Sequence, residues 1–337
     1  MQNLLDPAIL FFIFGVVAGT VKSNLEIPQP ISRFLSLYLL MALGLKGGFA
    51  LAHSGLTSQV MTSLGCALLL AVLVPVIGYG VLRRVLSGFD AAAVAATYGS
   101  VSAVTFVTAV QTLESQHVAF GGYMSAAMAL MESPAIILAV MFANALRQRE
   151  VPVAMSCGAG AAVLAMGAQP GRPAISLGKI LHESFTDGAQ LLLLGAMVIG
   201  ILTGDAGKAA MQPFTGDLFK GMLAFFLLDM GLLTARSLSR IPAKSPWLIS
   251  YAVLGPLTHA SLALGLAWLM KVPAGDATLL MVLAGSASYI AVPAVLRYAV
   301  PEANPSLYFG LSLGITFPLN ILFGIPLYSY VANKVLG

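Results

Sequence analysis

Charged side chains are scarce in this sequence. Only 9% of the 337 residues are Asp, Glu, Lys or Arg, whereas 58% are hydrophobic; a typical soluble domain carries about 25% charged residues. The mean hydropathy of +0.92 excludes a water-soluble globule. Because the apolar stretches are long rather than alternating, we expect helices and not a barrel. The composition therefore predicts an all-α integral membrane protein.

Reactive and metal-binding residues are also few. Two cysteines, Cys66 and Cys157, exclude a disulfide framework and a cysteine-based metal site. The four histidines are dispersed and form no zinc pattern. The sequence contains no phosphate-binding loop. Its Gly-x-Ser-x-Gly match, Gly310 to Gly314, lies inside an apolar run and not at the strand-to-helix turn that a nucleophile elbow requires. No block of like charges suits nucleic acid, although the net charge is +4. We expect neither an enzyme nor a resident cofactor.

Long apolar runs, each near the ~20 residues that a bilayer requires, recur along the whole chain. Ten transmembrane helices are expected, near 5–21, 34–51, 59–82, 91–112, 119–146, 188–204, 218–235, 247–270, 277–300 and 306–332. Most of the Lys and Arg residues fall on one side of this arrangement, which is the cytoplasmic side by the positive-inside rule. Both termini are then extracytoplasmic.

A long polar interval divides these spans into five and five. We expect a first five-helix repeat over 1–147, a cytoplasmic linker over 148–187 and a second five-helix repeat over 188–337. Since five is odd, the second half enters the membrane with the opposite orientation. Inverted repeats of this kind are common in secondary transporters.

Two sequence matches between the halves support the repeat. The segment "DAAAVAATYGSVSAVTF" begins at Asp90, and "DATLLMVLAGSASYIAV" begins at Asp276. At nearly the same spacing, "LLMALGLKG" around Gly44 matches "FLLDMGLLT" around Gly231. We interpret Asp90 and Asp276 as helix N-caps.

Both matching spans carry a Gly-Ser-x-Ser sequence near the middle. Glycine inside a helix costs about 1 kcal/mol relative to alanine, and broken helix is tolerated in lipid only where it faces protein or a wet cavity. We predict two discontinuous helices that cross near the bilayer midplane, inside a core that moves against a scaffold. The alternative is that these small residues only pack between helices.

Such a crossing suits a small anion. Each half-helix N-terminus is equivalent to about +0.5 charge and offers unpaired N–H groups, while unwound carbonyls suit a small cation. The candidate substrate-binding residues are Gly99, Ser100, Ser102, Thr105, Gly285, Ser286, Ser288 and Tyr289. No carboxylate lies in either Gly-Ser-x-Ser segment, which favours an anion over an organic cation.

Ionisable residues within spans usually face the bundle interior. Lys46 and Asp229 lie on equivalent spans, one turn apart in the repeat frame, and are candidates for a buried ion pair that fixes the scaffold. Glu132 is either a cation or proton site, or is hydrogen-bonded to backbone that Pro134 frees. The coupling-ion candidates are Ser102, Ser288 and Glu132.

Several motifs along the chain resemble one known family. They are "GSVSAVTFVTAVQTLE", "ASYIAVPAVLR", "GPLTHASLALGLA" and "PEANPSLYFGLSLGITFPLNILFGIPLY". The sequence resembles the sodium-dependent bicarbonate symporters of cyanobacteria and their bacterial relatives. The resemblance implies ten helices in two inverted repeats, extracellular termini, a homotrimer in a bacterial cytoplasmic (inner) membrane, and bicarbonate and Na⁺ bound where the broken helices cross. It also implies a PII-like cytoplasmic regulator, although the linker over 148–187 differs in composition from the family's.

One position departs from the family's pattern. Tyr289 stands where that pattern has an acidic residue, and Ala291-Val292-Pro293-Ala294 replaces a Ser-Gly-Pro-Pro run. The change removes a natural Na⁺ ligand beside the site. We expect Na⁺-coupled bicarbonate symport by alternating access. The alternatives are H⁺- or Na⁺-coupled transport of a small carboxylate or oxyanion, and a transport-incompetent sensor that binds a regulatory partner.

Overall fold

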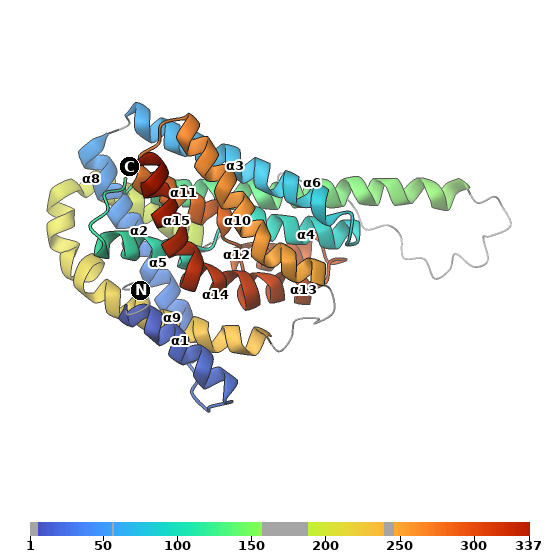
Figure 1. The fold of residues 1–337 in the computed structure, drawn as a ribbon, viewed down its shortest axis with the longest axis horizontal. Helices are drawn as coiled ribbons and strands as arrows, with labels where there is room; N and C mark the ends of the chain where they lie inside the picture. The colour runs from blue at the N-terminus through green and yellow to red at the C-terminus, as the bar shows by residue number, and fades with distance from the viewer. Residues whose placement is uncertain (1–5, 56, 157–187, 239–245) are drawn as a thin grey trace.

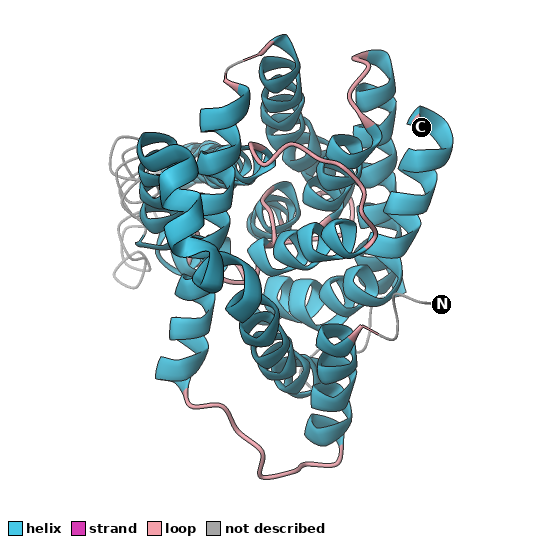
Figure 2. Ribbon diagram, turned by 90° about the vertical axis from the view of Figure 1, so that its left-hand side faces the viewer, coloured by secondary structure: helices cyan, strands magenta, loops and turns pink. Residues whose placement is uncertain are grey.

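The computed structural model describes residues 6–55, 57–156, 188–238 and 246–337. Within these ranges every regular element is a helix and none is a strand (Figures 1 and 2). Seven helical segments in the described ranges are long and apolar enough to cross a membrane, and two further apolar helices are shorter. The chain is thus an all-α, multi-pass membrane protein, as expected; that ten segments cross stays a prediction.

The helices of the first half follow the expected spans. They are α1 (Pro7–Thr20), α2 (Gln29–Ser54), α3 (Ser58–Leu82), α4 (Gly88–Gly99), α5 (Ala103–Ser115) and α6 (Met124–Ser156). In Figure 1, α6 extends away from the other helices. It continues to Ser156, inside the interval expected to be a linker, and residues 157–187 of that interval lie outside the described residues.

The second half contains more interrupted helices. They are α8 (Gly188–Gln212), the π-helical turn η3 (Pro213–Asp217), α9 (Leu218–Leu238), α10 (Pro246–Leu269), α11 (Ala274–Gly285) and α12 (Ala291–Ala299). The last stretch consists of α13 (Pro305–Phe309), η4 (Gly310–Thr316), α14 (Phe317–Leu319), η5 (Asn320–Gly324) and α15 (Ile325–Leu336). The expected span over 188–204 ends at Gly204, where φ of 54° interrupts α8 in a conformation that favours glycine.

Two pairs of helices pack with their backbones in contact. Helix α1 lies along α9, and α2 lies along α8. A Cβ atom on Gly231 would overlap the Phe12 carbonyl oxygen and lie 2.9 Å from the Cα of Gly15. One on Gly48 would overlap the Met197 carbonyl oxygen in the same way. Small residues allow this close approach between membrane helices, and we call α1, α2, α8 and α9 the scaffold helices.

The remaining helices, α3–α6 and α10–α15, are here called the core helices. Helix α3 packs on α4 and α6, and α11 packs on α10 and α15. In the span that contains α4 and α5, 94% of the most apolar stretch is buried. The interruption between these two helices therefore lies inside protein, as unpaired backbone at membrane depth requires.

The two aspartates that open the broken spans do not cap their helices. Ser87 caps α4 by accepting from the N–H of Asp90 at 3.1 Å, and the carboxylate of Asp90 accepts from the N–H of Asn304 at 2.8 Å. Asp276 lies in the first turn of α11 and accepts from the N–H of Gly121 at 2.6 Å. The interpretation as N-caps was wrong. Each carboxylate suits the first turn electrostatically and holds a loop from the other half of the chain.

Candidate functional site

Both expected helix interruptions are present. Helix α4 ends at Gly99 and α5 begins at Ala103, while α11 ends at Gly285 and α12 begins at Ala291. Each Gly-Ser-x-Ser sequence supplies the non-helical residues. The residue that follows each glycine has an almost identical extended backbone, with φ of −95° in the first half and −93° in the second. The two breaks thus begin alike, but the second is longer, because α12 begins only after Ile290.

The two interruptions contact each other directly. The N–H of Ser102 donates to the Ser286 hydroxyl at 3.0 Å. In the other direction, the N–H of Ser288 donates to the carbonyl of Thr97 at 2.8 Å. All four residues are buried. The hydrogen bonds that each helix loses at its break are therefore replaced partly by the other break.

Most of the serine and threonine hydroxyls at the crossing have partners within the protein. Ser102 caps α5, because its hydroxyl accepts from the N–H and the hydroxyl of Thr105 at 3.2 and 2.9 Å. The Ser288 hydroxyl accepts from the N–H of Val292 at 3.3 Å. Ser100 differs: its hydroxyl is 1% exposed and has no hydrogen-bond partner among the described residues. Burying such a group unpaired is costly.

Asn320 satisfies the carbonyl that the second break frees. Its side-chain amide donates to the Gly285 carbonyl at 2.8 Å, and the Tyr328 hydroxyl donates to the Asn320 side-chain carbonyl at 3.1 Å. Asn320 is fully buried. The sequence did not identify this role, although a lone amide within a long apolar segment is a signal for it.

A cavity of about 120 Å³ adjoins the crossing. Of the predicted residues, Ser102, Ser288, Tyr289 and Glu132 line it together. The others, Gly99, Ser100, Thr105, Gly285 and Ser286, belong to the crossing but do not line the cavity. Ser36 of α2 and Gln190 of α8 complete the polar part of the wall. The cavity therefore lies between the core and the scaffold helices.

Three apolar residues at helix N-termini line this cavity. Ala103 and Val104 form the first turn of α5, and Ala291 begins α12; all three line the cavity. Within the described chain these three N–H groups have no hydrogen-bond partner, as expected for the first residues of a helix. The sequence predicted unpaired N–H groups at the half-helix N-termini, but it did not identify these residues, whose side chains carry no signal.

Charged side chains are few at this cavity. Among the described residues that line it, Glu132 is the one acidic side chain and none is basic. Glu132 is half-buried on α6. Tyr289 lines the cavity with its ring edge-on to Phe317 at 5.2 Å between centroids, and its hydroxyl donates to the sulfur of Met230 at 3.5 Å. The wall can thus offer neutral donors and one carboxylate.

The predicted ion pair between Lys46 and Asp229 is not formed. Lys46 instead donates to both carboxylate oxygens of Glu114 at 2.9 and 3.2 Å, and Asp229 accepts from the Ser32 hydroxyl. Ser32 and Lys46 lie on the same helix, α2, and their separation corresponds to about 21 Å at 1.5 Å per residue. Because Asp229 meets α2 at Ser32, Lys46 is far beyond its reach.

Lys46 and Glu114 face a different, wider cavity of about 670 Å³. This cavity also lies between scaffold and core helices, because α2 and α8 form one side and α5 another. The ammonium group of Lys46 is 4.4 Å from the ring centroid of Phe219 on α9. Charged groups are thus concentrated at this second cavity, away from the crossing.

Two interrupted helices that cross inside an all-helical membrane protein, beside a small cavity bounded by two groups of helices, define a membrane transporter. The chain belongs to the Na⁺-dependent bicarbonate transporter superfamily, whose family model matches residues 7–333. This confirms the family expected from the sequence motifs. No match to the chain is found among curated proteins. The family implies a bicarbonate-type anion as substrate.

Proposed function

We propose that the protein is a secondary active transporter that carries bicarbonate, or a related small oxyanion, together with Na⁺ by alternating access. The cavity beside the crossing is the proposed binding site. The observation that carries the proposal is that Ala103, Val104 and Ala291, whose N–H groups have no hydrogen-bond partner among the described residues, line the same cavity as Glu132. Helix N-termini of this kind bind anions.

The carboxylate of Glu132 supports a coupled cation. An anion and an ionised carboxylate in one small, partly desolvated cavity repel each other strongly, because the effective dielectric constant is low there. A Na⁺ ion between them, or a proton on Glu132, removes this repulsion. Ser102 and Ser288 place hydroxyl oxygens in the same cavity wall. With Tyr289 in the family's acidic position, Glu132 takes over the role of the coupling residue.

The proposed movement is a displacement of the core helices against the scaffold helices. The inverted repeat belongs to this proposal, and matching contacts between the elements that it pairs support it. Asp90 holds the loop at Asn304, and its counterpart Asp276 holds the loop at Gly121. In this alignment α1 corresponds to α8, and α2 corresponds to α9. The contact of α1 with α9 therefore corresponds to the contact of α8 with α2. Ten spans and alternating access belong to this proposal.

Further features follow from the family resemblance and are part of the same proposal. They are a homotrimer, a bacterial inner membrane and extracytoplasmic termini. A PII-like regulator would bind on the cytoplasmic face, where the sequence places the interval 148–187. Most of that interval lies outside the described residues.

Uptake into proteoliposomes tests the proposal. We expect labelled bicarbonate to accumulate when an inward Na⁺ gradient is imposed, and Glu132→Gln to abolish the response to that gradient. Glu26→Gln, in the exposed loop before α2, is the matched control and should behave as wild type. Saturable uptake of another anion alone would reject bicarbonate as the substrate.

Two other outcomes identify the alternatives. A response to a proton gradient but not to Na⁺, lost in Glu132→Gln, would establish H⁺ coupling. Binding of an anion without flux above that of empty liposomes would indicate a sensor. An unchanged Na⁺ response in Glu132→Gln would remove Glu132 from the mechanism.

A further inference from the structure

Helix α12 is short, yet its first turn contributes to the proposed site. It runs only from Ala291 to Ala299, 9 residues, which corresponds to about 14 Å at 1.5 Å per residue. A helix of this length is marginal without tertiary contacts. Because the element is a single short rod, the group that fixes its last residue also sets the position of its first.

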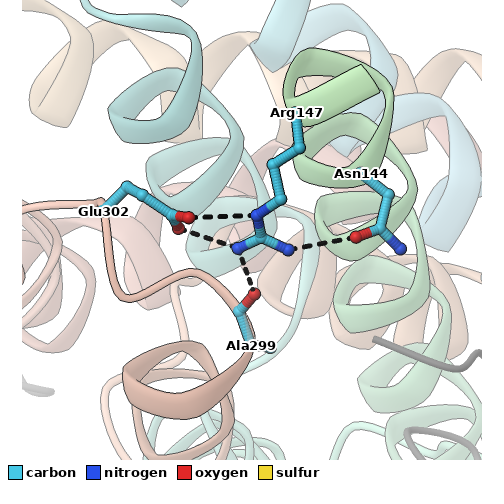
Figure 3. A network of polar contacts seen from close by, with 4 residues as sticks. All are labelled: Asn144, Arg147, Ala299 and Glu302. Atoms are coloured by element: carbon cyan, nitrogen blue, oxygen red, sulfur yellow. Dashed lines mark hydrogen bonds and ion pairs between the residues drawn. The ribbon is translucent and has the colours of Figure 1, made fainter. Parts of the chain in front are cut away.

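Arg147 of α6 holds the last residue of α12 (Figure 3). Its guanidinium donates to the Ala299 carbonyl at 3.0 Å and to both carboxylate oxygens of Glu302 at 3.0 and 2.8 Å. A further bond reaches the side chain of Asn144 at 3.0 Å. The Arg147 side chain is only 12% exposed. The planar fork of arginine suits this bidentate geometry, and a cation suits a helix C-terminus.

The loop that follows α12 has a second anchor. The N–H of Asn304 donates to Asp90 at the start of α4, at 2.8 Å. The side chain of Asn304 then caps α13 by accepting from the N–H of Ser306 at 3.0 Å. Glu302 and Asn304 belong to the sequence "PEANPS". This motif therefore ties the end of α12 to α6 and to α4, the first half of the other broken helix.

We propose that Arg147 and Glu302 are positioning residues for the anion. By clamping the last turn of α12 to α6, they fix the position of Ala291, which lines the cavity at the other end of the helix. The inference rests on the proposed function in one respect, namely that this cavity binds the anion. A purely structural pair would support folding without setting the affinity for the anion.

Kinetic constants of uptake separate these roles. Arg147→Lys keeps the charge but loses the fork, and we expect the KM for bicarbonate to rise about tenfold with little change in maximal rate, since small misplacements of binding groups are costly. Glu302→Gln should give the same result. Arg83→Gln, an exposed arginine after α3, is the control and should keep the wild-type KM.

A second measurement does not depend on the transported substrate. In a chain with Cys66→Ala and Cys157→Ala, the single substitution Ala291→Cys reports the position of the first turn of α12. We expect N-ethylmaleimide to modify this thiol several-fold faster when Arg147→Lys is added. If bicarbonate uptake fails in the wild type but labelling still responds, the proposed function fails and the clamp stands. The positioning role is overturned if Arg147→Lys lowers the melting temperature but changes neither the labelling rate of Ala291→Cys nor the KM for bicarbonate.

Discussion

The carbonyl of Gly285 has one side chain as its partner, the amide of Asn320. We predict that Asn320→Leu lowers the free energy of unfolding by about 1–3 kcal/mol, because a buried acceptor is left unpaired. Thermal unfolding in detergent measures the change. Asn333→Leu is the control, since Asn333 is exposed and bonds only within its own helix. Equal losses in the two variants would contradict the role of Asn320.

Tyr289 is buried against Phe317, and its hydroxyl contacts the Met230 sulfur at 3.5 Å and hydrogen-bonds with the Ser102 side chain. A thioether sulfur is a weak acceptor. Because a neutral hydrogen bond contributes about 0.5–1.5 kcal/mol net, Tyr289→Phe should lose at most about 1.5 kcal/mol, whereas Tyr289→Ala should lose about 3–5 kcal/mol by leaving a void. Thermal unfolding of both variants measures these losses. A Tyr289→Phe variant as unstable as Tyr289→Ala would show that the hydroxyl, not the ring, carries the stability.

At the scale of helices, α9 contains two glycines in opposite environments. Gly231 meets the backbone of α1, while a Cβ on Gly221 would have no atom within 4 Å. Gly221→Ala should stabilise the protein by up to about 1 kcal/mol through helix propensity. Gly231→Ala should destabilise it by about 1–3 kcal/mol through overpacking. Unfolding midpoints of the two variants test this contrast, and similar shifts of one sign would refute the close packing.

The ion pair of Lys46 and Glu114 joins a scaffold helix to a core helix. Its side chains are 24% and 34% exposed, so water and salt screen it. A double-mutant cycle with Lys46→Met and Glu114→Gln should give a coupling energy of about 0.2–1 kcal/mol. The coupling should shrink when salt is raised from 0.1 to 1 M. A coupling energy near zero at low salt would mean that the pair does not hold α2 to α5.

At the scale of the whole molecule, the two natural cysteines report topology. Cys66 is 3% exposed within α3, and Cys157 belongs to the interval that the charge distribution places in the cytoplasm. A membrane-impermeant thiol reagent should leave this protein unlabelled in intact cells. After the cells are permeabilised, the reagent should modify Cys157. The Cys157→Ala variant should then stay unlabelled. Labelling of Cys157 from outside would reverse the orientation.

The sequence predicted the helix interruptions well, because Gly-Ser-x-Ser combines a poor helix former with hydroxyls that hydrogen-bond locally. Both breaks fall on the predicted residues. The prediction of a Lys46–Asp229 ion pair was wrong. Aligning the two halves shows which positions are equivalent, but it does not show how far apart two equivalent positions lie in space. Unpaired N–H groups at the half-helix N-termini were predicted, but their assignment to Ala103 and Ala291 was not, since it depends on where each helix begins and not on a side chain. The ten spans and the inverted repeat stay predictions.

The close packing of the scaffold helices limits which amino-acid substitutions the protein can accept during evolution. Where Gly231 meets Phe12 and Gly48 meets Met197, main chain touches main chain. Mutation usually adjusts an interface gradually, by exchanging one side chain for a slightly larger or smaller one. Here no smaller residue exists and any larger one collides. A substitution at these glycines therefore disrupts the contact and cannot adjust it in small steps. Among related chains, we expect substitutions that change specificity to occur around the cavity and not along the scaffold helices.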